Sequence, residues 1–255
     1  MFIIVIKFLE DLALDINLNY QFKTRIYSGS SLKKNAKIIL TKKQSHKIIN
    51  VLRMKTDDDI LIFNNISGEW IGKINITNSK VCVICINLSK DPKIEKGPYL
   101  VFSPLKQSRT DWLIEKSTEC GVETFLPSLM KRTVVRKINR DRFQNNAIGA
   151  AEQSGRLSIP NIESLRTFKE QINFCVKKNK TIIFCDEMRL APLISDFNKT
   201  LNPSEIAIVV GPEGGFDDNE RDYVQTNIED LIECSIGPRI YRAETAALVA
   251  LALFQ

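Results

Sequence analysis

Two glycine-proline loops in the last part of the sequence have the residue types and spacing best suited to ligand binding. The apolar run Ile206–Val210 leads directly into Gly211-Pro-Glu-Gly-Gly-Phe216, and a second loop, Ile236-Gly-Pro-Arg-Ile-Tyr-Arg242, follows. In open α/β sheets, ligands bind beyond the carboxyl ends of the strands, and glycine lets the backbone approach a ligand closely. The two loops therefore predict one ligand held by backbone groups, although a tight structural turn would explain the first loop equally well.

The residues around the first loop narrow the class of ligand. No Lys-Ser/Thr pair follows the glycines and their spacing is not GxGxxG, so the loop matches neither common phosphate-binding motif. Asp217, Asp218 and Glu220 open the helix expected after the loop. Because acids at the positive end of a helix repel a phosphate, we expect an adenosine or a cationic small molecule.

Arginines beside the second loop indicate an anionic or uracil-like substrate near that ligand. Arg239 and Arg242 offer planar guanidinium groups that match a phosphate or a uracil carbonyl; solvated loop arginines are the alternative. Glu244 begins the last helix, where the helix dipole alone would favour a carboxylate. That helix is apolar on all sides up to Phe254, so we expect it to be buried in its domain and against a second subunit.

The distribution of charge indicates RNA as a partner. The chain has 255 residues and a formal net charge of +6, and residues 23–56 contain ten Lys or Arg and no Asp or Glu. A second cluster, residues 131–142, contains six cations and one acid. Phosphate binding strengthens with each charge neutralised, so we expect RNA here rather than a merely solvated lysine-rich surface. The candidate contacts are Arg25, Lys42, Lys43, Lys47, Arg53, Lys131, Arg132 and Arg136.

The six cysteines and the lone histidine suggest no metal site. Cys82 and Cys85 have CxxC spacing, but they lie in an expected strand, where they would point to opposite faces. No second pair of Cys or His ligands accompanies them. Free thiols fit a reducing compartment, so we expect a cytoplasmic protein without a bound metal.

The first residues of the chain are not expected to enter a membrane. Met1–Ile6 is apolar, but it is too short to span a bilayer and lacks the basic start and cleavage site of a signal peptide. Residues 1–22 are expected to form an extension outside the fold, or to result from a start codon assigned too far upstream.

The pattern of strands and helices divides the chain in two. Residues 23–90 predict short strands (24–27, 36–40, 60–64, 69–76 and 81–88) and one helix, 42–52, capped by Thr41. Residues 91–97 are charged and contain proline, which is typical of a linker. From residue 98 to 255, strands alternate with helices, which predicts a parallel sheet covered by helices. The expected strands are 99–103, 124–127, 181–185, 205–210 and 231–235, and the expected helices are 109–120, 140–153, 168–177, 218–226 and 243–254.

Five segments in this order resemble the RsmE family, the 16S ribosomal RNA uracil-N3 methyltransferases of the SPOUT superfamily. They are Val51–Met54, Ile114–Val122, Ala150–Arg156, Gly211–Gly215 and Ile236–Ala246. The resemblance covers residues 23–254. Two departures are mild: Ile236 and Ala243 stand where the family commonly has leucine and threonine.

The resemblance implies an α/β protein with an N-terminal PUA-like β-barrel, residues 23–90, and a C-terminal SPOUT methyltransferase domain with a trefoil knot, residues 98–255. It implies a homodimer that binds S-adenosylmethionine and methylates N3 of a uridine, position 1498 in the family, in 16S ribosomal RNA of the small subunit. The expected cofactor contacts are Phe184, Asp186, Glu187, Val210, Gly211, Gly214, Gly215, Ile236, Gly237, Ile240, Thr245 and Ala246. Arg239 is expected to face the RNA.

Two residues are candidates for the chemistry that this reaction requires. N3 of uracil carries a weakly acidic proton, so a carboxylate is expected to accept it. Glu244 is the candidate base and Arg242 the candidate partner for charge on the uracil oxygens, with Glu213 as the other carboxylate near the loops. The alternatives are a SPOUT enzyme acting on another nucleotide or on a ribose 2′-oxygen, and a non-catalytic ribosomal RNA-binding assembly protein.

Overall fold

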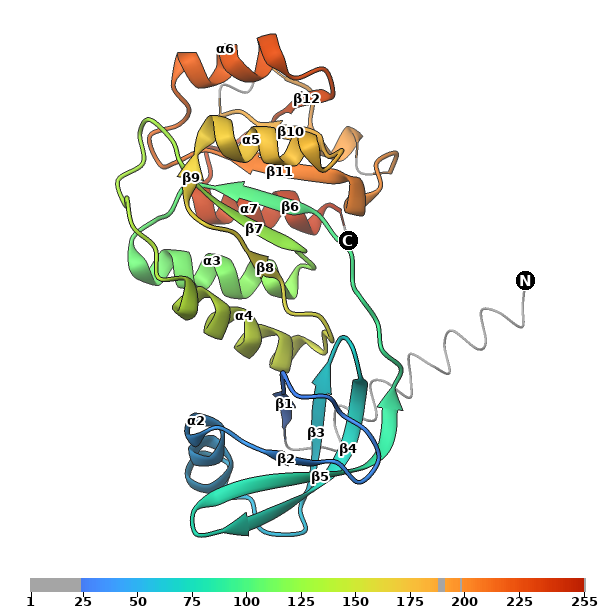
Figure 1. Cartoon of the computed structure of the whole chain (residues 1–255). Helices are drawn as coiled ribbons and strands as arrows, with labels where there is room; N and C mark the ends of the chain where they lie inside the picture. Colours follow the sequence, from blue (N-terminus) through green and yellow to red (C-terminus); the bar gives the residue numbers. More distant parts are fainter. Residues whose placement is uncertain (1–23, 188–190, 198, 255) are drawn as a thin grey trace, which may run out of the picture. The chain divides into compact units, whose positions relative to one another are not determined.

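The chain folds into two compact units. The computed structural model describes residues 24–187, 191–197 and 199–254, so the predicted extension, residues 1–22, lies outside the described part (Figure 1). The first unit extends to Ile94 and also takes in Glu152–Ser158; the second comprises Glu95–Ala151 and the residues from Ile159 onward. The chain passes from one unit to the other within residues 91–97. Nothing in the sequence indicated that Glu152–Ser158 belongs with the first unit.

The first unit is built on a five-stranded sheet with the strand order β1-β3-β4-β5-β2 (Figure 1). The strands are β1 (Arg25–Tyr27), β2 (Lys37–Ile39), β3 (Asp59–Asn64), β4 (Gly68–Thr77) and β5 (Lys80–Lys90). β1 runs parallel to β3, and the other pairs are antiparallel. All five strands lie where the sequence predicted strands.

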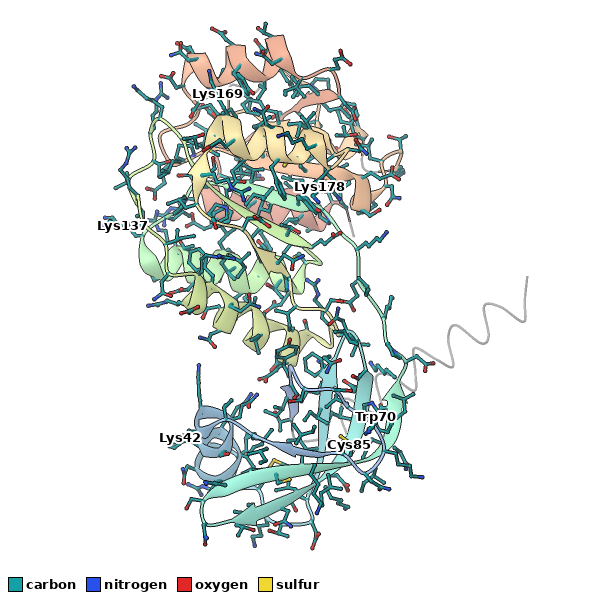
Figure 2. All side chains as sticks on the ribbon, in the orientation of Figure 1. Lys42, Trp70, Cys85, Lys137, Lys169 and Lys178 are labelled. Carbon is teal, nitrogen blue, oxygen red and sulfur yellow. The ribbon has the colours of Figure 1, made fainter. Side chains whose placement is uncertain are left out.

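Burial alternates along β5, as it does in a strand with one face on a core. Val81, Val83 and Cys85 belong to the core of the first unit, whereas Cys82 and Ile84 are half-buried. Cys82 and Cys85 therefore point to opposite faces, as the sequence predicted, and Cys85 lies within the sheet in Figure 2. This geometry removes the two thiols from any shared metal site.

The helix predicted for residues 42–52 begins where expected but changes its pitch. Thr41 caps α2 (Lys42–His46) through a reciprocal capping box with Gln44. The chain continues as a π-helical turn, Lys47–Val51, and the next N–H donates to the Lys47 carbonyl at 2.9 Å. The first turn of this segment thus follows local capping chemistry, whereas the wider second turn was not evident from the sequence.

A buried ion pair holds the segment Glu152–Ser158 in the first unit. The Nε of Arg25 donates to Glu69 Oε2 at 2.6 Å, and the two side chains are 6% and 0% exposed. The other Arg25 nitrogens donate to three backbone oxygens within Glu152–Arg156. The Glu152 carboxylate in turn accepts the Tyr27 N–H and the Lys47 ammonium. Such additional partners are needed to offset the desolvation of a buried ion pair.

The second unit contains a seven-stranded sheet in which every pair is parallel, as the alternating pattern predicted. The order is β12-β10-β11-β6-β7-β8, with β9 paired to β7. The strands are β6 (Tyr99–Phe102), β7 (Thr124–Leu129), β8 (Asn161–Ile162), β9 (Arg166–Thr167), β10 (Thr181–Cys185), β11 (Ile206–Val210) and β12 (Leu231–Cys234). β8 and β9 were not predicted, because two residues are too few to show a period.

Helices cover both faces of this sheet (Figure 1). They are α3 (Gln107–Glu119), α4 (Arg140–Ser154), α5 (Phe168–Lys177), α6 (Asp218–Asn227) and α7 (Ala243–Ala252), each at a predicted position. Residues of α3, α4 and α7 share one core cluster with Ile206, Ile208 and Val210, and residues of α5 and α6 share another with Ala207 and Val209. Since both faces of β11 are covered, its five residues are all apolar.

The strand order marks the edge where a ligand should bind. β6 is the first strand of the sheet, but it lies between β7 and β11, so the chain builds the sheet first on one side of β6 and later on the other. Ligands of open α/β sheets bind at such a switch point, beyond the carboxyl ends of the strands. A ligand site is therefore expected among the loops that follow β6, β10, β11 and β12.

Candidate functional site

A cavity of about 570 Å³ opens beyond the carboxyl ends of β12, β10 and β11, three neighbouring strands. Its walls come from residues 185–187, 210–215, 235–237 and 239–243, with Arg109 of α3 and Ala246 of α7. Both glycine-proline loops thus line one cavity, as the prediction of a shared ligand requires. Small-molecule sites typically measure roughly 300–1,000 Å³, so the cavity has a suitable size.

Gly215 is required by backbone conformation and by space. Its φ is 74°, a value that residues with a side chain rarely adopt. A Cβ atom at this position would lie 2.1 Å from Glu187 Oε1. Any other residue would therefore displace Glu187 from the wall of the cavity.

Arg221, on α6, holds the two carboxylates that follow β10. Its Nε and Nη2 donate to the two carboxylate oxygens of Asp186 at 3.1 and 3.2 Å, and Nη2 also pairs with Glu187. Nη1 donates to the Phe216 carbonyl at 2.9 Å, and the Phe216 N–H donates to Glu187 at 3.2 Å. The hydrogen bonds to Asp186 raise the pKa of Arg221. This forked cation joins the loops after β10 and β11 into one wall.

Arg109, on α3, connects two carboxylates of the site. It pairs with Glu213 in the first glycine loop, and its Nε lies 3.7 Å from Glu244 Oε1. Glu244 is 8% exposed, and its Oε2 has no hydrogen-bond partner among the residues described. Leaving a carboxylate oxygen buried and unpaired costs stability, so such an atom is a candidate for a functional role.

Most of the predicted cofactor contacts line the cavity. They are Asp186, Glu187, Val210, Gly211, Gly214, Gly215, Ile236, Gly237, Ile240 and Ala246, and the predicted Arg239 and Arg242 lie beside them. Phe184 does not: its side chain is 1% exposed and packs against Phe216, with ring centroids 4.2 Å apart. The expectation for Phe184 is corrected because alternate residues of a strand face opposite ways. Thr245 also lies outside the lining, as does Glu244.

Sequence reasoning missed the two arginines that organise the cavity. Arg221 meets Asp186 across 35 positions, and Arg109 meets Glu213 across 104. No local spacing connects residues so far apart. One feature of the sequence could have indicated Arg221: it is an arginine in the first turn of a helix that is otherwise rich in acids there.

The acids predicted to open the helix after the first loop lie at the start of α6, where Asp217 and Glu220 accept hydrogen bonds from backbone N–H groups. Asp217 is the N-cap and forms a reciprocal capping box with Glu220. The hydrogen bond from Asn219 lowers the pKa of Asp217. Glu220 also accepts the Lys131 N–H at 2.8 Å. Because the positive end of α6 is already neutralised, it is poorly suited to a phosphate.

α7 is buried on one side only. Its buried residues are Glu244, Ala246, Ala247, Ala250 and Leu251; Thr245, Leu248 and Val249 are half-buried and Ala252 is exposed. The less buried residues recur at helical spacing and form a stripe. Within this chain the helix is therefore not covered all round.

The predicted RNA contacts separate into accessible and buried residues. Lys42, Lys43, Arg53, Lys131, Arg132 and Arg136 are exposed, and Lys42 is seen on α2 in Figure 2. Arg25 is corrected as an RNA contact, because it is buried and its donors are occupied by Glu69 and the backbone. Lys47 pairs with Glu152 at 2.8 Å. Arg132 donates to the Gly214 carbonyl at 2.6 Å, which ties the second basic cluster to the cavity loop.

Two classes of site find no support in the described ranges. No group of three or more His, Cys, Asp or Glu side chains there could hold a metal ion. No helix in those ranges has the length and apolar character needed to cross a membrane.

Comparisons with known proteins match both parts of the chain. Residues 94–255 match the model of an RNA methyltransferase domain, and residues 40–85 match that of an RNA methyltransferase PUA domain. Ribosomal RNA small subunit methyltransferase E of Rickettsia conorii is 32% identical, over 89% of this chain and 93% of that protein. The Bacillus subtilis protein of the same name is 29% identical, over 83% and 87%.

Solved structures share the fold over the same length. A Legionella pneumophila protein described as a methyltransferase, solved with bound S-adenosylmethionine, has 27% identity and a TM-score of 0.79, over 91% of this chain and 96% of its own. Ribosomal RNA small subunit methyltransferase E of Neisseria gonorrhoeae, bound to S-adenosylmethionine, has a TM-score of 0.77 over 90% and 95%; at 24% identity it supports the fold alone.

Proposed function

The chain belongs to the ribosomal RNA small subunit methyltransferase E family, and we propose that it transfers a methyl group from S-adenosylmethionine to N3 of a uridine in 16S ribosomal RNA. The observation that carries the proposal is the cavity in which both glycine-proline loops meet. The family models and the relatives support methyl transfer to small-subunit ribosomal RNA. The choice of N3 as the acceptor rests on the resemblance to the uracil-N3 enzymes.

The residues of the cavity fit the adenosine part of this cofactor. Four glycines, Gly211, Gly214, Gly215 and Gly237, line the cavity, and glycine lets the backbone approach a ligand closely. Asp186 and Glu187 line the cavity, and Arg221 fixes both carboxylates in orientation. Ribose hydroxyls are suitable donors to such oxygens. The neutralised start of α6 agrees with a ligand that carries no phosphate.

The protein's own groups must orient the uracil and accept its proton. The cofactor, when bound, supplies a methyl group that its sulfonium has already activated. Glu244 is the candidate base because its buried Oε2 retains a free lone pair in the described structure. Arg242, the N-cap of α7, lines the cavity and is the candidate for stabilising charge on the uracil oxygens. Glu213, which pairs with Arg109, is another carboxylate that lines the cavity.

The finer architecture belongs to the same proposal. Residues 23–90 would form a PUA-like barrel that binds RNA, and residues 98–255 a SPOUT domain whose knotted loops hold the cofactor. The half-buried stripe of α7 would be covered by a second copy of the chain, since apolar surface of this kind favours association. The site of action would be the cytoplasm, where ribosomal subunits carry the RNA.

Mass mapping of ribosomal RNA tests the proposal directly. Small subunits from cells that lack this protein are incubated with the purified protein and S-adenosylmethionine, and the digested 16S RNA is analysed by mass spectrometry. We expect one new methyl group, on the base of a single uridine. A methyl group on ribose or on another nucleotide would favour the alternative SPOUT activities. Cofactor-independent RNA binding without any transfer would favour an assembly protein.

A further inference from the structure

A second cavity, of about 360 Å³, lies at the same edge of the sheet. Its lining includes Pro104 and Leu105, which follow β6, and Thr110 of α3. Arg109, the residue before Thr110, lines the first cavity. The first turn of α3 therefore separates the two cavities. None of the residues predicted from the sequence as site residues lines the second one.

The second cavity has apolar walls drawn from three segments. Leu105 and Phe143 are buried, whereas Val135 and Ile138, on the loop between β7 and α4, are half-buried. Asn139 also lines the cavity; its Oδ1 accepts the Arg142 N–H at 3.0 Å, which leaves the side-chain amide as a donor. Apolar faces with a small number of directional polar groups suit a planar ring with a hydrogen-bonding edge.

One guanidinium in the lining is fixed in orientation. The Nε of Arg142 donates to Asp111 Oδ1 at 2.8 Å, and a second nitrogen pairs with the other carboxylate oxygen. Asn146 donates to the same carboxylate at 2.8 Å. The hydrogen bond to Asp111 raises the pKa of Arg142. A forked pair of this kind holds the guanidinium plane, and such planes stack on the bases of single-stranded RNA.

The charge around the cavity favours a nucleic acid. Asp111, the one acid in the lining, is paired with Arg142. Lys137, labelled in Figure 2, also lines the cavity. Among the described residues it forms no ion pair. Residues 131–142 supply six cations and one acid. A phosphate beside the cavity would therefore meet a net positive surface.

We propose that the second cavity receives an unpaired base of the ribosomal RNA that adjoins the nucleotide methylated in the first cavity. This inference rests on the proposed function. Val135, Ile138 and the Arg142 plane would contact the faces of the base, and Asn139 its edge. Lys137 would contact the flanking phosphate. RNA is recognised in this way where bases are splayed out of a strand.

A matched pair of tryptophan substitutions tests the proposal. Val135→Trp fills the cavity, whereas Val134→Trp adds the same side chain at the preceding residue, which is 74% exposed and outside the lining. Transfer to unmethylated small subunits and calorimetric binding of S-adenosylmethionine are measured for both. We expect Val135→Trp to raise the KM for subunits about tenfold or more and to leave cofactor affinity within about twofold, while Val134→Trp changes neither by more than about twofold.

A second pair keeps the test decisive if Val135→Trp fails to fold. Lys137→Ala removes a cation that lines the cavity, and Lys177→Ala removes an exposed cation from α5. We expect the KM for subunits to rise for Lys137→Ala alone. Equal KM values within each folded pair would overturn the proposal. It would also be overturned if the cavity bound free uridine or adenosine monophosphate saturably and Val135→Trp abolished that binding without changing the KM for subunits. If the wild-type chain methylates no subunits, the proposed function itself fails.

Discussion

The Nε of Arg109 lies 3.7 Å from Oε1 of Glu244, while Oε2 of Glu244 is buried with no hydrogen-bond partner in the described structure. The same guanidinium pairs with Glu213 in the first glycine loop. A single residue of α3 thus orients both carboxylates close to the cavity. Glu244 thus has one oxygen facing a cation and another with an unused lone pair.

Glu244→Gln is expected to slow methyl transfer while cofactor binding persists. The amide keeps the shape of the side chain but cannot take the N3 proton, and loss of a general base typically costs about 10²–10⁴ in rate. The measurement is turnover at saturating subunits and S-adenosylmethionine, with cofactor affinity from calorimetry. Glu213→Gln is the control, since it alters the other partner of Arg109. Normal turnover of Glu244→Gln would exclude Glu244 as the general base and leave it only a stabilising role at the start of α7.

Arg242→Ala is expected to abolish most methyl transfer and to retain most cofactor affinity. Removing one group that stabilises developing charge typically costs about 10²–10³ in turnover. The side chain is exposed at the rim of the cavity, so the protein should remain folded. Single-turnover rates and cofactor titration are compared with the wild type. Parallel losses in both would show that Arg242 builds the cofactor pocket instead.

Arg221→Ala is expected to weaken cofactor binding. Without the guanidinium, Asp186 and Glu187 lose the cation that fixes them, and we expect the Kd for S-adenosylmethionine to rise about tenfold or more, which corresponds to ~1.4 kcal/mol. Asp218→Ala is the matched control. Asp218 also pairs with Arg221, but its side chain is 93% exposed, so the pair should contribute little. Equal affinities of the two variants would exclude a positioning role for Arg221.

Two glycine substitutions are expected to change stability in opposite directions. Gly215→Ala meets both a φ of 74° and the Glu187 carboxylate, so it should destabilise the protein by more than about 1 kcal/mol. Gly149→Ala lies inside α4, where an added Cβ meets nothing within 4 Å, and should stabilise it by about 0.5–1 kcal/mol. Denaturant unfolding followed by circular dichroism measures both. A neutral Gly215→Ala would show that the loop tolerates a side chain.

Charge reversal on α2 is expected to reduce RNA binding. Lys42→Glu and Lys43→Glu change two exposed residues whose ammonium groups form no hydrogen bond or ion pair among the residues described. The affinity for 16S RNA should fall, and the slope of log affinity against log salt should become shallower, because fewer counterions are released. Lys47 is left unchanged in this variant because it pairs with Glu152. Unaltered affinity and slope would assign these lysines to a solvated surface.

Local patterns sufficed for the order and type of the elements. The predicted strands and helices of the second unit are all present, and the all-apolar run Ile206–Val210 is the central strand that such a run favours. Thr41 caps the helix at which it was expected, and Asp217 lies at the start of the helix expected after the first loop. These features depend on residues a few positions apart, which is why one sequence reveals them. The π-helical turn and the two-residue strands were not predicted, because they are too short to show a hydrophobic period of their own.

The sequence by itself determined that two glycine-proline loops follow buried strands of a parallel sheet, and hence that a ligand site should lie at one edge of that sheet. Only the tertiary structure decided which charged side chains are already paired and which keep an unpaired atom. Arg25 pairs with Glu69, 44 positions away, and Arg221 pairs with Asp186, 35 positions away. Glu244, by contrast, keeps an unpaired oxygen. Burial and pairing depend on which distant segments the fold brings together, whereas backbone preference depends on neighbours in the chain.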